Sequence, residues 1–180
     1  MVTPSRRQGS EMQLFYTGIG SRKTPGPILS MMEDIAARFN QLGVYLRSGG
    51  AQGADSAFES KAGAFKEIYI PWDGFNDRKA NEQTTIIPSI TDKSRKLVED
   101  FHPAPERLKR GAFSLMHRNG FQVLGENLDH PSACVVCYTP DGAFSGGTGQ
   151  AMRIADSMNI PIFNLYHQDD QDILKKVLSI

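Results

Sequence analysis

Apolar and polar residues alternate along the chain in blocks that predict strands and helices in turn. Five short apolar segments predict buried strands, at residues 13–18, 44–50, 67–71, 133–140 and 161–166. Segments with apolar residues three and four positions apart predict helices at 25–42, 54–65, 94–101 and 170–180, and one or two helices within 105–124. A further helix follows the glycine-rich stretch near residue 146. This order is typical of an α/β fold with a mainly parallel sheet and helices on both faces.

The stretch 72–92 departs from this alternation. It shows no sustained period and mixes aromatic, amide and charged side chains. A loop of this length inside a folded domain is usually functional or mobile. Its aromatic residues, Trp72 and Phe75, are candidates to stack on a flat ligand, and local packing is the alternative interpretation.

The length of 180 residues predicts one domain, residues 11–180, preceded by a disordered tail, residues 1–10. Lysine plus arginine equals aspartate plus glutamate, so the formal net charge is zero, which argues against a general polyanion-binding surface. No apolar stretch approaches the roughly 20 residues of a membrane span. The first residues lack the apolar core of a signal peptide, and we therefore expect a cytoplasmic protein that does not contact membranes.

The two cysteines, Cys134 and Cys137, lie three positions apart in a predicted strand. Such residues point to opposite faces of a sheet, so a shared metal ion is not expected. We predict that both thiols belong to the core, in a reducing compartment. The sequence indicates neither a metal site nor a cofactor.

Three glycine-rich turns each connect a predicted strand to a predicted helix. They are "TGIGSRKTPG" (17–26), "RSGGAQGAD" (47–55) and "TPDGAFSGGTGQ" (139–150). Such turns meet at the carboxyl edge of a parallel sheet, where backbone N–H groups and helix N-termini favour anions. None is a phosphate-binding G-K-[ST] loop or a complete G-x-G-x-x-G fingerprint, which disfavours a standard dinucleotide dehydrogenase.

The motifs "GSRKTP", "SGGAQGAD", "MHRN" and "SGGTGQA" together resemble the SLOG superfamily over about residues 15–165. This group includes the Rossmann-like domain of DprA-type DNA-processing proteins and the Lonely Guy (LOG) phosphoribohydrolases. The resemblance implies a Rossmann-like, doubly wound fold and a nucleotide pocket, and pairing into homo-oligomers. The first two motifs look most like the DprA branch.

This sequence departs from both family patterns at positions and modules on which their activities depend. The glutamate of the LOG signature falls on Arg153, and its opening proline falls on Ser145. The flanking modules and the basic balance of DprA-type proteins are absent from this sequence. The resemblance therefore implies the fold and the pocket but leaves the reaction open.

Several polar residues are candidates for the chemistry of the pocket. Arg118 aligns with an arginine of both branches, and Arg22 adjoins the first turn; both could bind a phosphate. Asp55 is either an N-cap residue or a carboxylate that binds a ribose or stabilises a cationic centre. Glu59 could join it, although a surface role is the simpler interpretation. His117 has no recognisable catalytic partner.

We predict a nucleotide-binding protein whose ligand is a nucleoside phosphate or a nucleotide-derived molecule. The predicted ligand-binding residues are Gly18, Gly20, Ser21, Arg22, Gly49, Gly50, Asp55, Arg118, Asn119, Ser145, Gly146, Gly147, Thr148, Gly149 and Gln150. One alternative is a LOG-like hydrolase of the N-glycosidic bond of a nucleoside monophosphate, with Asp55 and Arg118 as catalytic residues. The other is a DprA-like protein with single-stranded DNA as its partner.

Overall fold

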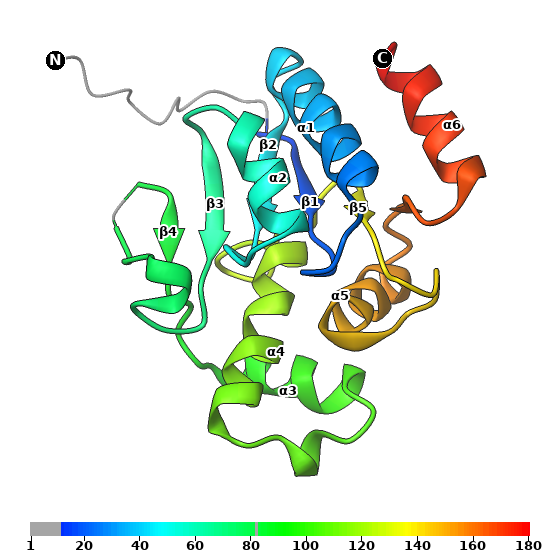
Figure 1. Cartoon of the computed structure of the whole chain (residues 1–180). Coiled ribbons are helices and arrows are strands. Elements are labelled where there is room, and N and C mark those ends of the chain that lie inside the picture. The colour runs from blue at the N-terminus through cyan, green and yellow to red at the C-terminus, as the bar shows by residue number, and fades with distance from the viewer. Residues whose placement is uncertain (1–11, 82) are drawn as a thin grey trace, which may run out of the picture.

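Six parallel strands form the central sheet of the protein (Figure 1). In this computed structural model, residues 12–81 and 83–180 are described. The sheet has the order β4-β3-β2-β1-β5-β6. The strands are β1 (Phe15–Gly18), β2 (Tyr45–Ser48), β3 (Lys66–Tyr69), β4 (Thr85–Ile86), β5 (Val135–Cys137) and β6 (Ile162–Asn164).

The chain changes direction across the sheet once. It runs outward from β1 through β2 and β3 to β4, then returns to place β5 on the other side of β1. In open parallel sheets, the crevice at such a reversal, beyond the carboxyl ends of the strands, is where ligands bind. The reversal between β1 and β5 is therefore where the three glycine-rich turns can act together.

Helices cover both faces of the sheet. On one face, α1, α2 and α6 pack against Tyr16, Leu46 and Val136, and on the other α4 and α5 pack against Val135 and Cys137. The α-helices are α1 (Gly26–Gln41), α2 (Ala54–Lys61), α3 (Asp92–Phe101), α4 (Arg110–Leu124), α5 (Gly146–Ser157) and α6 (Gln168–Leu178). The predicted doubly wound, Rossmann-like α/β architecture is confirmed.

The segment 72–92 is more ordered than its sequence suggested. It contains a 3₁₀ helix, η1 (Phe75–Asp77), and the edge strand β4, which pairs with β3. Asn81 Oδ1 accepts hydrogen bonds from the backbone N–H groups of Thr84 at 2.7 Å and Thr85 at 3.2 Å, and so fixes the turn into β4. A second 3₁₀ turn, η2 (Pro105–Arg107), precedes α4.

The strand β5 places the two cysteines as predicted. Cys137 is buried on the α4–α5 side of the sheet, whereas Cys134 packs against the cluster on the opposite side. Both thiols are free, and burial raises the pKa of Cys134 to about 12. The thiols therefore stay protonated and act as small apolar groups of the core.

The predicted tail, residues 1–10, lies outside the described residues, and the assignment of residues 11–180 to one domain stays a prediction. Among the helices of residues 12–81 and 83–180, none combines the length and apolar character needed to cross a membrane.

Replacement of Phe58 tests the α2 side of the core. Its ring is fully buried and packs edge-on against Tyr16, so Phe58→Ala leaves a cavity. We expect the free energy of unfolding in urea to fall by about 3–5 kcal/mol. The control Phe65→Ala removes a ring that is 50% exposed, and should cost only about 0.5 kcal/mol. Equal losses would contradict this account of the core.

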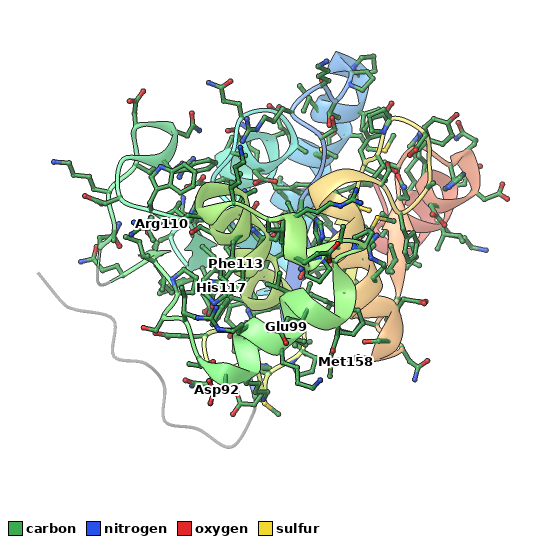
Figure 2. All side chains as sticks on the ribbon, turned by 90° about the horizontal axis from the view of Figure 1, so that it is seen from below. Asp92, Glu99, Arg110, Phe113, His117 and Met158 are labelled. Carbon is green, nitrogen blue, oxygen red and sulfur yellow. The ribbon has the colours of Figure 1, made fainter. Side chains whose placement is uncertain are left out.

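The contact between α3 and α4 predicts a loss of stability in acid. His117 on α4 stacks on Phe113 (Figure 2), and its Nε2 lies 2.7 Å from the Oγ of Ser94 on α3. Burial and the charge of Arg95 hold the pKa of His117 below its usual 6.5. The unfolded chain therefore binds the proton first, and stability is lost as the pH falls through 6.5 towards the lower folded pKa.

His117→Gln should remove this part of the pH dependence in urea unfolding measured between pH 5 and 8. His167→Gln, at an exposed histidine in the N-cap position of α6 and outside this contact, is the matched control for the loss of an imidazole. An unaltered profile in His117→Gln would show that other groups govern the acid sensitivity.

Candidate functional site

A cavity of about 480 Å³ opens at the carboxyl edge of the sheet, beyond the ends of the paired strands β1 and β5. Its wall contains parts of all three glycine-rich turns, the start of α2 and the middle of α4. Sequence segments more than a hundred residues apart thus share one site. The lining residues are Ile19, Gly20, Ser21, Arg22, Ala51, Asp55, Leu115, Met116, Arg118, Asn119, Gln122, Tyr138, Thr139, Pro140, Ser145, Gly146, Gly147 and Thr148.

The N-terminus of α5 forms one side of this cavity. Ser145 occupies the N-cap position, but its hydroxyl donates to Asp141 Oδ1 at 2.7 Å instead of capping the helix. The first N–H groups of a helix have no partner inside it, and here they belong to Gly146, Gly147 and Thr148. This helix end therefore offers backbone donors and a partial positive charge to a bound anion.

The second glycine-rich turn brings a carboxylate and a guanidinium close to one glycine. A Cβ atom at Gly49 would lie 2.9 Å from Asp55 Oδ2 and 3.0 Å from Arg118 Nε, and closer still to Gln122 Nε2. A side chain at position 49 would therefore have to displace Gln122 and move the buried Asp55 and Arg118. Glycine is required here by packing around the charged pair.

Asp55 lines the cavity but is almost fully buried. Its Oδ2 accepts a hydrogen bond from the N–H of Ala51 at 3.1 Å, and only 4% of the residue is exposed. Burial raises the pKa of Asp55, while Arg118 and the backbone N–H groups of Ala51, Gly20 and Gly49 oppose that rise. The carboxylate is thus engaged by the protein itself.

Arg118 and Arg22 supply the positive charge of the site. Arg118 is 8% exposed, and its Nε donates to the carbonyl of Gly49 at 3.3 Å and its Nη1 to that of Leu115 at 2.8 Å. Burial lowers its pKa, and Asp55 opposes this shift. Arg22 is exposed at the rim. Two guanidinium groups and one carboxylate leave the cavity with a surplus of positive charge.

An amide pair joins α4 to α5 at the cavity wall, where Asn119 lines the cavity and Gln150 does not. Asn119 Nδ2 donates to the carbonyl of Gly147 and to Gln150 Oε1, both at 3.0 Å. Gln150 is fully buried, and its Nε2 has no hydrogen-bond partner within the described part of the chain. The pair fixes the first turn of α5 relative to Arg118.

Most sequence-predicted residues meet in this cavity. Ten of them line it: Gly20, Ser21, Arg22, Asp55, Arg118, Asn119, Ser145, Gly146, Gly147 and Thr148. The five others lie outside the lining: Gly18, Gly49, Gly50, Gly149 and Gln150.

Packing accounts for three of the glycines outside the lining. A Cβ atom at Gly18 would lie 2.7 Å from the Phe58 ring, and one at Gly149 would lie 2.6 Å from the carbonyl oxygen of Phe144. Gly50 has a left-handed φ of +67°, which disfavours a side chain. These glycines shape the turns and do not form the inner surface of the cavity.

Several lining residues were not identified from the sequence. Gln122 follows Arg118 by four residues, which is about one helical turn. The predicted helix therefore already placed both side chains on the same face, and Gln122 could have been predicted from the sequence. Leu115 precedes Arg118 by three residues and could have been found in the same way. Tyr138 could not have been predicted in this way. It lines the cavity because β5 ends at Cys137, and the sequence pattern does not define that strand end to a single residue.

Two other candidates lie away from the cavity lining. Glu59 forms ion pairs with Arg78 at 2.5 Å and Lys66 at 3.2 Å, and does not join Asp55. His117 contacts Ser94 on α3 and does not line the cavity. Neither supports a catalytic arrangement with Asp55.

Comparison with known proteins supports the fold. No family model matches the sequence, and no curated protein matches it. The chain is similar in structure to DNA processing protein A from Helicobacter pylori, a single-stranded DNA-binding protein, with a TM-score of 0.54 and 18% identity over 92% of this chain and 73% of that one. It is also similar to the Moco carrier protein of the alga Chlamydomonas reinhardtii, with a TM-score of 0.51 and 14% identity over 93% of this chain and 85% of that one. At these identities the comparisons establish that the chain has the Rossmann-like fold of these proteins.

Proposed function

We propose that this protein binds a small molecule carrying a phosphate group, a nucleoside phosphate or a nucleotide-derived ligand, in the cavity beyond the carboxyl ends of β1 and β5. One observation carries the proposal. The uncapped N-terminus of α5 faces the same cavity as Arg118 and Arg22. Backbone donors, a helix dipole and two guanidinium groups that converge on one space are the chemistry of phosphate binding.

The size of the cavity suits such a ligand. Small-molecule sites usually enclose about 300–1,000 Å³, and this one has about 480 Å³. Apolar side chains from Ile19, Leu115 and Met116 complete its wall, so a ligand with both an anionic and a less polar part would be enclosed. The similarity to a carrier of a small molecule agrees with this proposal.

The arrangement favours binding over hydrolysis of an N-glycosidic bond. Among the described residues that line the cavity, Asp55 is the only acidic one, and it is buried and bonded to the Ala51 N–H. Arg153 occupies the position of the LOG glutamate and donates to the carbonyls of Phe101 at 2.7 Å and Phe144 at 3.2 Å. It thus ties the third glycine-rich turn to α3.

Single-stranded DNA is the second candidate ligand, because the structural relative from Helicobacter pylori binds it. The zero net charge of this chain does not favour it, since phosphate contacts dominate the affinity of DNA-binding proteins. DNA binding that weakens steeply between about 50 and 200 mM salt would support this candidate.

The predicted homo-oligomer would be measured by light scattering in the same solutions.

The first experiment is to purify the protein from cells, denature it and identify any released small molecule by mass spectrometry. We expect a phosphate-bearing molecule in a stoichiometric amount. Protein that is purified empty and shows no thermal shift with any of a panel of nucleotides would contradict the proposal, because tight binding to the native state must stabilise it.

Arg22→Gln tests the charge at the rim of the cavity. Arg22 is exposed, so its replacement should leave the fold intact while the dissociation constant of a nucleoside monophosphate rises about tenfold, equal to about 1.4 kcal/mol. Lys23→Gln removes a neighbouring exposed cation that does not line the cavity, and should change affinity little. If calorimetric titrations show the same loss of nucleotide affinity in Arg22→Gln and Lys23→Gln, the ligand responds only to the net charge of this surface, and Arg22 has no specific role.

Gly147→Ala tests the helix end itself. An added Cβ atom would lie 3.1 Å from Met116 Cε in the cavity wall, with no other atom within 4 Å. We expect an unchanged or slightly higher unfolding temperature, because alanine favours a helix, but about tenfold weaker nucleotide binding. The control is Gly111→Ala in α4, where a Cβ atom meets nothing within 4 Å and binding should be unaffected.

A further inference from the structure

A second hollow, of about 200 Å³, adjoins the main cavity and shares Arg22 with it. The other residues of its wall are Gln52 from the second glycine-rich turn, and Phe75 and Asn76 from η1. The shared arginine makes the two spaces neighbours.

Phe75 connects the two spaces physically. The Arg22 Cζ lies 6.0 Å from the centroid of the Phe75 ring and the Arg118 Cζ lies 5.2 Å from it. The ring packs edge-on against Trp72 at 5.5 Å. One aromatic ring thus contacts both guanidinium groups of the phosphate site and also forms part of the second hollow.

The backbone around Phe75 is held in an unusual conformation. Gly74, Asn76 and Asp77 have φ angles of +88°, +49° and +57°, a left-handed region that non-glycine residues rarely adopt. The Asn76 Nδ2 donates to the carbonyl of Gly50 at 3.0 Å and fastens η1 to the second turn. The chain therefore keeps Phe75 and Asn76 beside the main cavity.

The four side chains of the hollow share one property. Each ends in a planar group: a guanidinium, two carboxamides and a phenyl ring. A flat ring can stack on planar groups, and the two amides can both donate and accept hydrogen bonds at its edge. Phe75 is only 8% exposed, so the exposed side chains of Arg22 and Gln52 are the planar groups that can reach such a ring. Of the described residues, those that line the hollow include no acidic side chain, so they do not repel a ligand that carries a phosphate.

We propose that this hollow is a subsite for the planar, hydrogen-bonding ring of the ligand whose phosphate lies in the main cavity. The inference rests on the proposed function. It assigns the ligand a heteroaromatic base at the Phe75 side, recognised by Gln52 and Asn76, with Arg22 between the base and the phosphate.

The test is a calorimetric comparison of ribose 5-phosphate, which has no base, with AMP, GMP, CMP and UMP. We expect at least one nucleotide to bind wild-type protein about tenfold or more tightly than ribose 5-phosphate does, because stacking and edge contacts add affinity. Gln52→Ala and Asn76→Gly should reduce that nucleotide to the affinity of ribose 5-phosphate and leave ribose 5-phosphate itself unchanged. Glycine at position 76 keeps the left-handed backbone available.

Gln41→Ala, at an exposed glutamine at the far end of α1, is the matched control and should alter no affinity. Gln52 is itself exposed, so Gln52→Ala gives a result even if Asn76→Gly perturbs η1. Nucleotides that bind no better than ribose 5-phosphate, or that are insensitive to Gln52→Ala and Asn76→Gly, would overturn the subsite and leave the phosphate site standing. If neither ribose 5-phosphate nor any nucleotide binds wild-type protein, the proposed function fails and the subsite with it.

Discussion

The candidate site depends on the close approach of two charged side chains to the backbone of Gly49. Arg118 comes from α4 and Asp55 from α2. A Cβ atom at Gly49 would lie 2.9 Å from the Asp55 carboxylate and 3.0 Å from the Arg118 guanidinium. Burying each charge alone would be costly, so the guanidinium, the carboxylate and the N–H groups around them stabilise one another. This arrangement fixes how α4 faces the second turn, and thereby the width of the cavity.

The rest of the site follows from that constraint. Once Arg118 is in place, its neighbour Asn119 reaches the carbonyl of Gly147 and positions the first turn of α5. Gln122, one turn further along α4, forms another part of the wall. The N-terminus of α5 and Arg118 are thus joined through Asn119, which explains how a chain of zero net charge can gather positive charge at one place.

The sequence predicted the parts of this site better than it predicted their roles. Glycine-rich turns after apolar strands predicted Ser21, Ser145 and Gly147 as ligand-binding residues, and all three line the cavity, because parallel strands bring such turns to one edge. The same reasoning included Gly149, which packs against Phe144 and lies outside the lining. A sequence shows that a glycine is present, whereas only neighbouring atoms show whether a ligand or a side chain requires it.

The sequence by itself determined the alternating strands and helices, the parallel sheet and the edge at which a ligand could bind, because these follow from local periodicity and short connections. Only the tertiary structure decided that η1 and β4 form within residues 72–92, since the pairing of Thr85 with Ile68 and the bond from Asn76 to Gly50 join distant segments. It also decided that Arg118 is buried against Gly49 while Glu59 pairs with Arg78. Long-range contacts leave no periodic signal in the sequence, and they determine which polar residues face the cavity.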